Sequence, residues 1–173
     1  LFESNGAYFR LAEHEKALGN LITIQSPFFA DEYYPESHIL KAIALRACQQ
    51  QMRVRYARCV DMLDDLYAGL ADATYPRRLR RWATVDLLII DDVGLGQVKK
   101  RDGEPTAAHT LYDLIDRRHA KASTAVTSNI QLSAWGNYLG DVPLAVAVLD
   151  RLAMHAVHID IDGPSYRQHV AME

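Results

Sequence analysis

The chain has 173 residues, which is long enough to bury a sizeable core and typical of one domain. Its net charge of −3 excludes a globally basic nucleic-acid-binding protein, so contact with DNA would require a local basic patch. No apolar run approaches the roughly 18 residues of a membrane span, and Cys48 and Cys59 lack the spacing of metal ligands. We therefore expect a single domain over residues 1–173, in a cytoplasmic protein with reduced thiols and no membrane partner.

Strand-like and helix-like segments alternate along the chain. The predicted strands are at 21–24, 54–56, 85–92, 123–127 and 157–161. The predicted helices are at 39–47, 60–70, 108–115, 132–139 and 143–154. Strands separated by helices require right-handed crossovers, so the pattern predicts an α/β fold, a three-layer sandwich with a parallel sheet.

The third predicted strand carries the most specific signal. It is apolar at every position from Leu87 to Ile90, which indicates burial on both faces, and it ends in Asp91 and Asp92. Open parallel sheets bind ligands at the carboxyl ends of their strands. A carboxylate there suits a hydrated magnesium ion on nucleotide phosphates, because Mg²⁺ keeps most of its waters. The alternative is a buried strand followed by an acidic turn.

The acidic end of this strand is one of five short motifs spread along the chain. The motifs are Asp86–Asp91, Thr127–Asn129, Ser133–Gly136, Leu149–Leu152 and Ser165–Arg167. In this order and at these spacings the chain resembles AAA+ ATPases, and more closely their IstB-like transposition helpers and DnaC-like helicase loaders. The resemblance runs from about Asn20 to His169. It implies a P-loop NTPase fold with strand order 5-1-4-3-2, and ATP with Mg²⁺ as cofactors.

The resemblance also implies roles for individual residues. Asp91 matches the magnesium-associated Walker B acid, and Ser37 matches the helix start that contacts the same ion through the nucleotide. Asp92 stands where most members have a glutamate that polarises the attacking water, and Asn129 matches the sensor 1 residue. Arg151 matches the arginine finger that reaches the nucleotide of a neighbouring subunit. Asn129 could instead cap the next helix or make a turn, and Arg151 could instead pair with Asp150 or a surface carboxylate.

The segment before Ser37 departs from the family pattern. A P-loop reads GxxxxGK[ST], because glycines let backbone amides wrap the phosphates and the lysine reaches the outer ones. Here no glycine occurs from Asn20 to Ala68, and Glu36 stands in the place of the lysine. Two alternatives stay open: a degenerate homologue that has lost ATP binding, or a misread stretch of sequence. ATP hydrolysis is therefore an open question from the sequence.

A dense basic cluster lies on the predicted helical segment before the acidic strand. Arg77, Arg78 and Arg81 share one side of such a helix. One interpretation is sequence-independent contact with DNA phosphates, to which Lys99–Arg101 could add. The alternative is a solvated helix face whose arginines pair with nearby acids, namely Asp61, Asp64 and Asp65.

Together these observations lead to one functional expectation. We expect an ATP-binding helper for DNA transposition that assembles with copies of itself on double-stranded DNA and delivers that DNA to a transposase. Two alternatives are a loader for a replicative helicase and a non-catalytic scaffold that has lost ATP binding. Since relatives usually carry an N-terminal partner-binding segment that is mostly missing here, the chain is expected to be a fragment.

Overall fold

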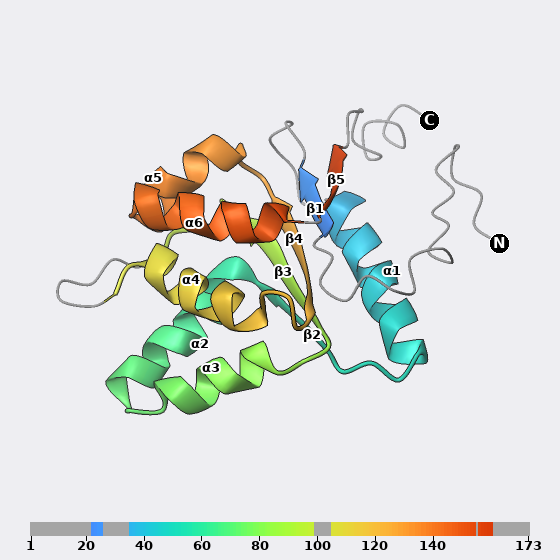
Figure 1. The fold of residues 1–173 in the computed structure, drawn as a ribbon, viewed down its shortest axis with the longest axis horizontal. Coiled ribbons are helices and arrows are strands. Elements are labelled where there is room, and N and C mark those ends of the chain that lie inside the picture. Colours follow the sequence, from blue (N-terminus) through green and yellow to red (C-terminus); the bar gives the residue numbers. More distant parts are fainter. Residues whose placement is uncertain (1–21, 26–34, 99–104, 155, 161–173) are drawn as a thin grey trace, which may run out of the picture.

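The structure, a computed structural model, describes residues 22–25, 35–98, 105–154 and 156–160. In this part of the chain a parallel sheet lies between two layers of helices (Figure 1). The strands are β1 (Ile22–Gln25), β2 (Val54–Arg58), β3 (Leu87–Val93), β4 (Ser123–Ser128) and β5 (Val157–Asp160). The helices are α1 (Pro35–Gln49), α2 (Cys59–Ala71), α3 (Tyr75–Ala83), α4 (Ala107–Arg118), α5 (Trp135–Leu139) and α6 (Val142–Ala153), with a short 3-10 turn at Leu132–Ala134.

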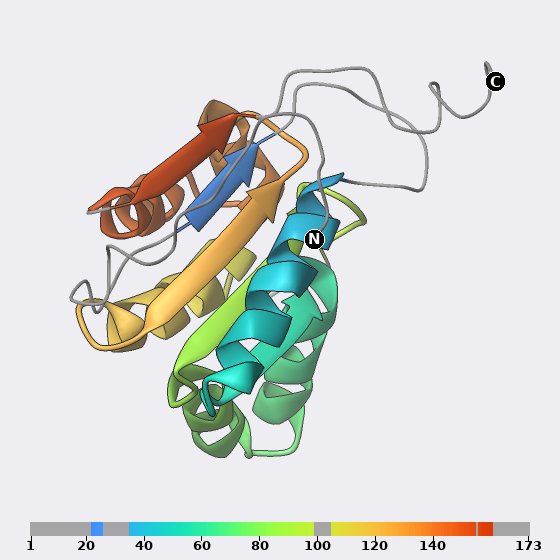
Figure 2. The ribbon, with the colours of Figure 1, turned by 90° about the vertical axis from the view of Figure 1, so that its right-hand side faces the viewer.

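The sheet has the order β2-β3-β4-β1-β5, and every pairing is parallel. Read from the other edge this is 5-1-4-3-2, and the predicted three-layer parallel class is confirmed. Because the strands are parallel, their carboxyl ends meet at one edge of the sheet. Figure 2 shows the arrowheads of the strands pointing the same way, with the first turn of α1 at that same end.

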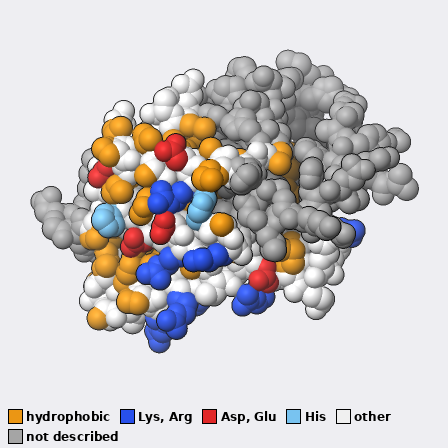
Figure 3. Space-filling model, in the orientation of Figure 1, with side chains coloured by type: hydrophobic (Ala, Val, Ile, Leu, Met, Phe, Trp, Pro, Cys, Tyr) orange, Lys and Arg blue, Asp and Glu red, His pale blue; other side chains and the backbone are white. Residues whose placement is uncertain are grey.

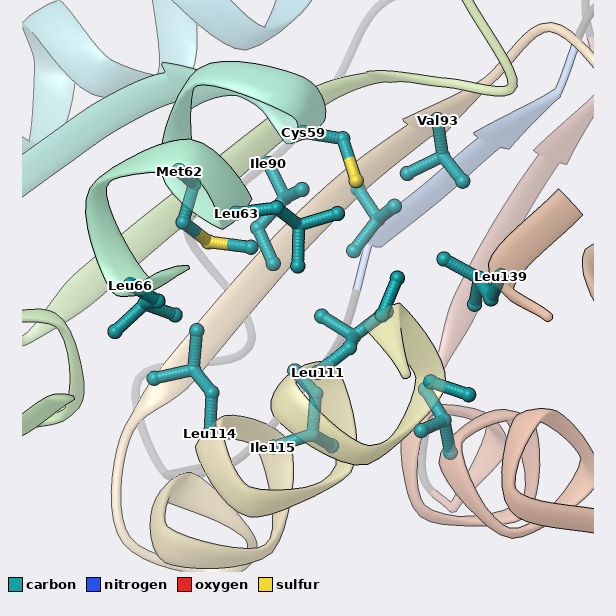
Figure 4. Close-up of a cluster of buried hydrophobic side chains, with 14 of the residues drawn as sticks. Cys59, Met62, Leu63, Leu66, Ile90, Val93, Leu111, Leu114, Ile115 and Leu139 are labelled. Carbon is teal, nitrogen blue, oxygen red and sulfur yellow. The ribbon is translucent and has the colours of Figure 1, made fainter. Parts of the chain in front are cut away.

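Both faces of the sheet are covered, which explains the uninterrupted apolar run of β3. Leu87 and Ile89 pack on one face against Leu40 of α1, whereas Leu88 and Ile90 belong to the larger cluster on the other face. In that cluster, side chains of α2 and α4 meet over the end of β3 (Figure 4). Burying each such side chain contributes roughly 1.5–3 kcal/mol, so the two-sided packing fixes β3 at the centre of the fold.

The described helices are short, and α1 is the longest of them with 15 residues. Within the described part of the chain, none combines the length and apolar character needed to cross a bilayer. Helix α3 begins at Tyr75 with Pro76 in its first turn, where the missing amide of a proline costs no hydrogen bond. The basic cluster is therefore helical, as its spacing predicted.

Candidate functional site

The carboxyl end of β3 contains a β-bulge. Between its last two pairings with β4, β3 has one residue more than β4, so Asp91 and Asp92 both lie opposite Thr127. A bulge interrupts the ladder and re-aims the side chains of the bulged strand, and bulges are common next to active sites. Asp92 adopts a positive φ of 61°, a conformation that aspartate tolerates better than most residues. The two adjacent acids therefore point in different directions from the end of one strand.

Two hydroxyl groups hold the Asp91 carboxylate, which is 1% exposed. Thr127 donates a hydrogen bond to one carboxylate oxygen and accepts one from the backbone N–H of Asp92 at 2.8 Å. Tyr56, on the neighbouring strand β2, donates to the other oxygen. The sequence did not predict either hydroxyl as a partner of Asp91. Thr127 belongs to one of the predicted motifs, whereas Tyr56 carries no signal, because it reaches Asp91 only through the pairing of β2 with β3.

Asp92 and Asn129 are brought together as the sequence predicted. The Asn129 side-chain amide donates to Asp92 Oδ1 at 3.2 Å, and the Asn129 backbone N–H donates to the Val93 carbonyl at 2.9 Å. Both side chains are half-buried, so they remain accessible to a small ligand. An amide and a carboxylate side by side can orient a water molecule from two directions. Their catalytic roles remain predictions.

The motif at 133–136 holds the carboxyl end of β4 in place through hydrogen bonds. The Trp135 ring N–H donates to Ser128 Oγ at 3.0 Å, and the Ser128 hydroxyl donates to the Ile130 carbonyl at 2.7 Å. Trp135 is 1% exposed, so it anchors the turn that follows β4 in the core. This part of the family pattern thus has a structural reason, since it fixes the position of Asn129.

Gly94 follows directly after the bulged end of β3. It has a φ of +97°, and a Cβ added to it would lie 2.6 Å from Ile130 Cγ1. We expect Gly94→Ala to lower the free energy of unfolding by about 2–3 kcal/mol, from backbone strain and overpacking together. Urea unfolding measures this loss. Gly96→Ala is the matched control, because Gly96 also has a positive φ of +84° but an added Cβ would meet Val60 only at 3.2 Å. Equal losses in the two variants would contradict the close contact with Ile130.

Ser37 lies in the first turn of α1, directly after Glu36. The last residue of β1, Gln25, pairs with Ser128, so β1 ends at the same edge of the sheet as the bulge. A helix N-terminus at this edge is the usual place for a phosphate. Residues 26–34, which would form the phosphate cradle, lie outside the described residues.

The residues present fit one end of a magnesium nucleotide and not the other. Asp91 is a fixed carboxylate at a strand end, which suits a hydrated Mg²⁺. At the phosphate end, Glu36 brings negative charge into the first helical turn, and no glycine is available between Asn20 and Ala68. Coulomb repulsion at about 4 Å amounts to roughly 1–4 kcal/mol near a protein surface, which weakens phosphate binding.

Arg151 lies in the last turn of α6 and is held by α4. It donates to Asp116 Oδ1 at 2.8 Å and to the Tyr112 hydroxyl at 2.5 Å, and its guanidinium lies 4.3 Å from the centre of the Tyr112 ring. Together with Thr124 it lines a small hollow at the start of β4, the opposite end of that strand from Asn129. Within one chain, Arg151 therefore pairs with a surface carboxylate, as the alternative prediction stated. Its role as an arginine finger toward a neighbour remains a prediction.

The three arginines of the predicted DNA patch have different surroundings. Arg78 is paired with Asp65 at 2.5 Å and with Asp72 at 2.9 Å, so it connects α3 to α2. The side chain of Arg81 is 62% exposed and its ion pair with Asp65 is long, at 3.9 Å. Arg77 is exposed as well. Arg77 and Arg81 thus remain available at the surface, whereas Arg78 has a structural role as well. Two predicted motifs lie outside the described residues, at 99–101 and 165–167.

Comparison with known families gives a match over most of the chain. The family described as IstB-like ATP binding protein matches residues 35–173. An insertion sequence IS232 protein of Bacillus thuringiensis subsp. berliner, named for ATP binding, is 32% identical over 132 residues, which are 76% of this chain and 51% of that protein. The insertion sequence protein y4pL of Sinorhizobium fredii, also named for ATP binding, is 33% identical over 134 residues, 78% of this chain and 53% of that protein. The chain thus spans about half the length of these relatives.

Solved structures show the same fold at lower identity. Domain III of the Thermotoga maritima replication initiation protein DnaA superimposes with a TM-score of 0.65 and 17% identity, covering 92% of this chain and 61% of that chain. The DnaC helicase loader superimposes with a TM-score of 0.60 and 17% identity, covering 83% of this chain and 78% of that chain. At such identities the likeness establishes the fold alone.

Proposed function

This chain belongs to the family of IstB-like ATP binding proteins, and from this premise we propose that it is the AAA+ domain of a helper protein for DNA transposition. In this role it assembles with copies of itself on double-stranded DNA in the cytoplasm and delivers that DNA to a transposase. The family match over residues 35–173 is the observation that carries the proposal. The relatives named for insertion sequences support it further.

Within this function we propose that the bulged end of β3 is the magnesium and water side of a nucleotide site. Asp91, held by two hydroxyl groups, and Ser37, in the first turn of α1, would hold the hydrated metal ion. Asp92 and Asn129, joined at 3.2 Å, orient the water. ATP bound with Mg²⁺ would supply the energy for assembly, but Glu36 and the glycine-free segment do not fit its phosphates.

A second candidate function is favoured by that misfit. Without a phosphate cradle, the domain serves as an AAA+ scaffold that assembles without hydrolysing ATP. A role as a helicase loader has weaker support, because the likeness to the DnaC loader at 17% identity extends to the fold alone.

Light scattering of the purified chain with duplex DNA tests the proposal. We expect an assembly of several copies on duplexes of about 50 base pairs in low salt, where phosphate contacts are strongest. Single strands of equal length serve as the control, and a preference for them would favour the loader alternative. A chain that stays monomeric and leaves both DNAs unbound would contradict the transposition-helper role.

A further inference from the structure

A basic hollow of about 480 Å³ lies at the edge of the sheet where the strands begin, opposite the bulged end of β3. Four cationic side chains and one carboxylate line it, namely Arg53, Arg80, Arg117, Lys121 and Asp86. They come from separate segments, since Arg53 precedes β2, Arg80 and Arg117 end α3 and α4, and Lys121 follows α4. Lys and Arg side chains gather on this side of the molecule, over α3 and α4 (Figure 3).

Most of the positive charge in the hollow is uncompensated. Arg53 binds Asp86 through its backbone N–H at 2.8 Å and its guanidinium at 2.9 Å, and these contacts lower the pKa of Asp86 to about 2. Asp86 is therefore ionised and already occupied. Among the residues that the structure describes, Arg80, Arg117 and Lys121 form no ion pair. Three free cations thus surround a hollow on a chain whose net charge is −3.

A buried arginine supports the wall of the hollow. Arg118, 1% exposed, donates to the carbonyl oxygens of Ala83 and Val85, two of the lining residues, at 2.9 and 2.8 Å. The charge of Arg118 lies directly behind the lining residues. Because the carbonyl oxygens of Ala83 and Val85 already accept its hydrogen bonds, they do not repel an incoming anion as free acceptors would. The wall is therefore rigid and electropositive before any ligand arrives.

Helix ends alone do not account for this arrangement. Cations in the last turns of α3 and α4 offset the helix dipoles, an effect worth about 0.3–1 kcal/mol each. Arg53 and Lys121 belong to neither helix, and yet they converge on the same hollow. The convergence of three stretches of the chain, at Arg53, at 80–86 and at 117–122, points to a bound anion.

We propose that this hollow binds the phosphate backbone of double-stranded DNA, an inference that rests on the proposed DNA-directed function. A polyanion fits better than a single small anion because the basic surface continues along α3. There, Arg77, Arg78 and Arg81 line a second hollow of about 390 Å³. Arg80, which lines the first hollow, belongs to the same helix α3 as these residues, so both hollows border α3 and can contact different phosphates of one duplex. The DNA backbone carries regularly spaced phosphate charges, and contacts to these phosphates bind DNA without reading its sequence.

The test compares two double variants of equal charge in duplex DNA binding. Arg117→Ala with Lys121→Ala removes two free cations from the hollow. Lys41→Ala with Arg46→Ala removes two exposed cations from α1, which covers the opposite face of the sheet. Fluorescence anisotropy with labelled duplex DNA across salt concentrations gives the logarithmic salt slope. We expect the hollow variant to reduce this slope by roughly two, about 0.9 for each lost phosphate contact, while the α1 variant leaves it unchanged.

The other outcomes overturn the inference in distinguishable ways. If the unmodified chain binds duplex DNA and the hollow variant keeps its slope, the hollow is not the phosphate site, although the DNA-directed function stands. Equal reductions in both variants would show an effect of overall charge and would reject the site. Loss of binding to polyglutamate with an unchanged DNA slope would assign the hollow to an acidic polypeptide instead. If the unmodified chain binds no DNA at low salt, the proposed function fails together with the hollow.

Discussion

Replacing Arg151 with alanine is expected to lower ATP turnover by about 10³–10⁵ in a variant whose phosphate cradle has been restored. That background carries glycines and a lysine ahead of Ser37, including Glu36→Lys. The structure holds Arg151 at the opposite end of β4 from Asn129 of its own chain, so the predicted finger role requires a neighbouring subunit. Loss of its charge should therefore leave ATP binding intact and slow hydrolysis in the assembled state. Phosphate release from the restored protein and its Arg151→Ala variant, with assembly monitored by light scattering, measures the effect.

Mixing two inactive variants separates action on a neighbour from action within one chain. Asp92→Asn removes the charge that orients the water, and Arg151→Ala removes the group offered to the neighbour. Mixed assemblies contain interfaces with an intact Asp92 on one side and an intact Arg151 on the other, so part of the activity should return. If no mixture recovers activity although assembly is confirmed, Arg151 is a structural partner of Asp116 and not a finger.

Arg118 is expected to have the largest effect on stability. Its guanidinium donates to a set of buried acceptors, the carbonyl oxygens of Trp82, Ala83, Val85 and Ser123 and the hydroxyl of Thr124. One side chain thereby joins the end of α3 to the beginnings of β3 and β4. Burial lowers the pKa of Arg118 to about 10, so the group stays charged at neutral pH and forms charge-assisted hydrogen bonds.

Arg118→Met keeps the length of the apolar stem and removes every donor. We expect the free energy of unfolding to fall by about 3–5 kcal/mol, because several buried carbonyl groups lose their partner at once. Denaturant unfolding followed by circular dichroism measures the change. Arg117→Met is the matched control: the neighbouring side chain is exposed, so its replacement should change stability by less than about 0.5 kcal/mol. Similar losses in both variants would contradict the role assigned to the buried guanidinium.

The parallel sheet and its helices could be predicted because their signals are local. The apolar run from Leu87 to Ile90 reflects burial on both faces, and the alternation of strands and helices restricts the crossovers. The meeting of Asp92 with Asn129 was also predictable, since parallel strands end at one edge. Each of these inferences needs only the period of a segment and the direction of its neighbours.

Contacts that depend on register could not be predicted in this way. The bulge that places both acids opposite Thr127 is a property of the pairing between β3 and β4, and neither strand records it alone. Tyr56 reaches Asp91 only because β2 lies beside β3 with a particular offset. Arg78 pairs with Asp72, which was not among the expected acids, because the turn between α2 and α3 brings the two together. Arg118 gave no signal either, since its partners are backbone carbonyls and one threonine hydroxyl at the end of α3 and the beginnings of β3 and β4.

Isothermal titration of the chain with ATP and Mg²⁺ tests whether the metal side of the site is intact while the phosphate side is lost. We expect no low-micromolar binding by the chain as it stands, because Glu36 and the glycine-free segment exclude the phosphates. We also expect that restoring glycines and a lysine ahead of Ser37 creates such binding, and that Asp91→Asn weakens it again in the presence of Mg²⁺. Low-micromolar binding of ATP by the unaltered chain would contradict the claim.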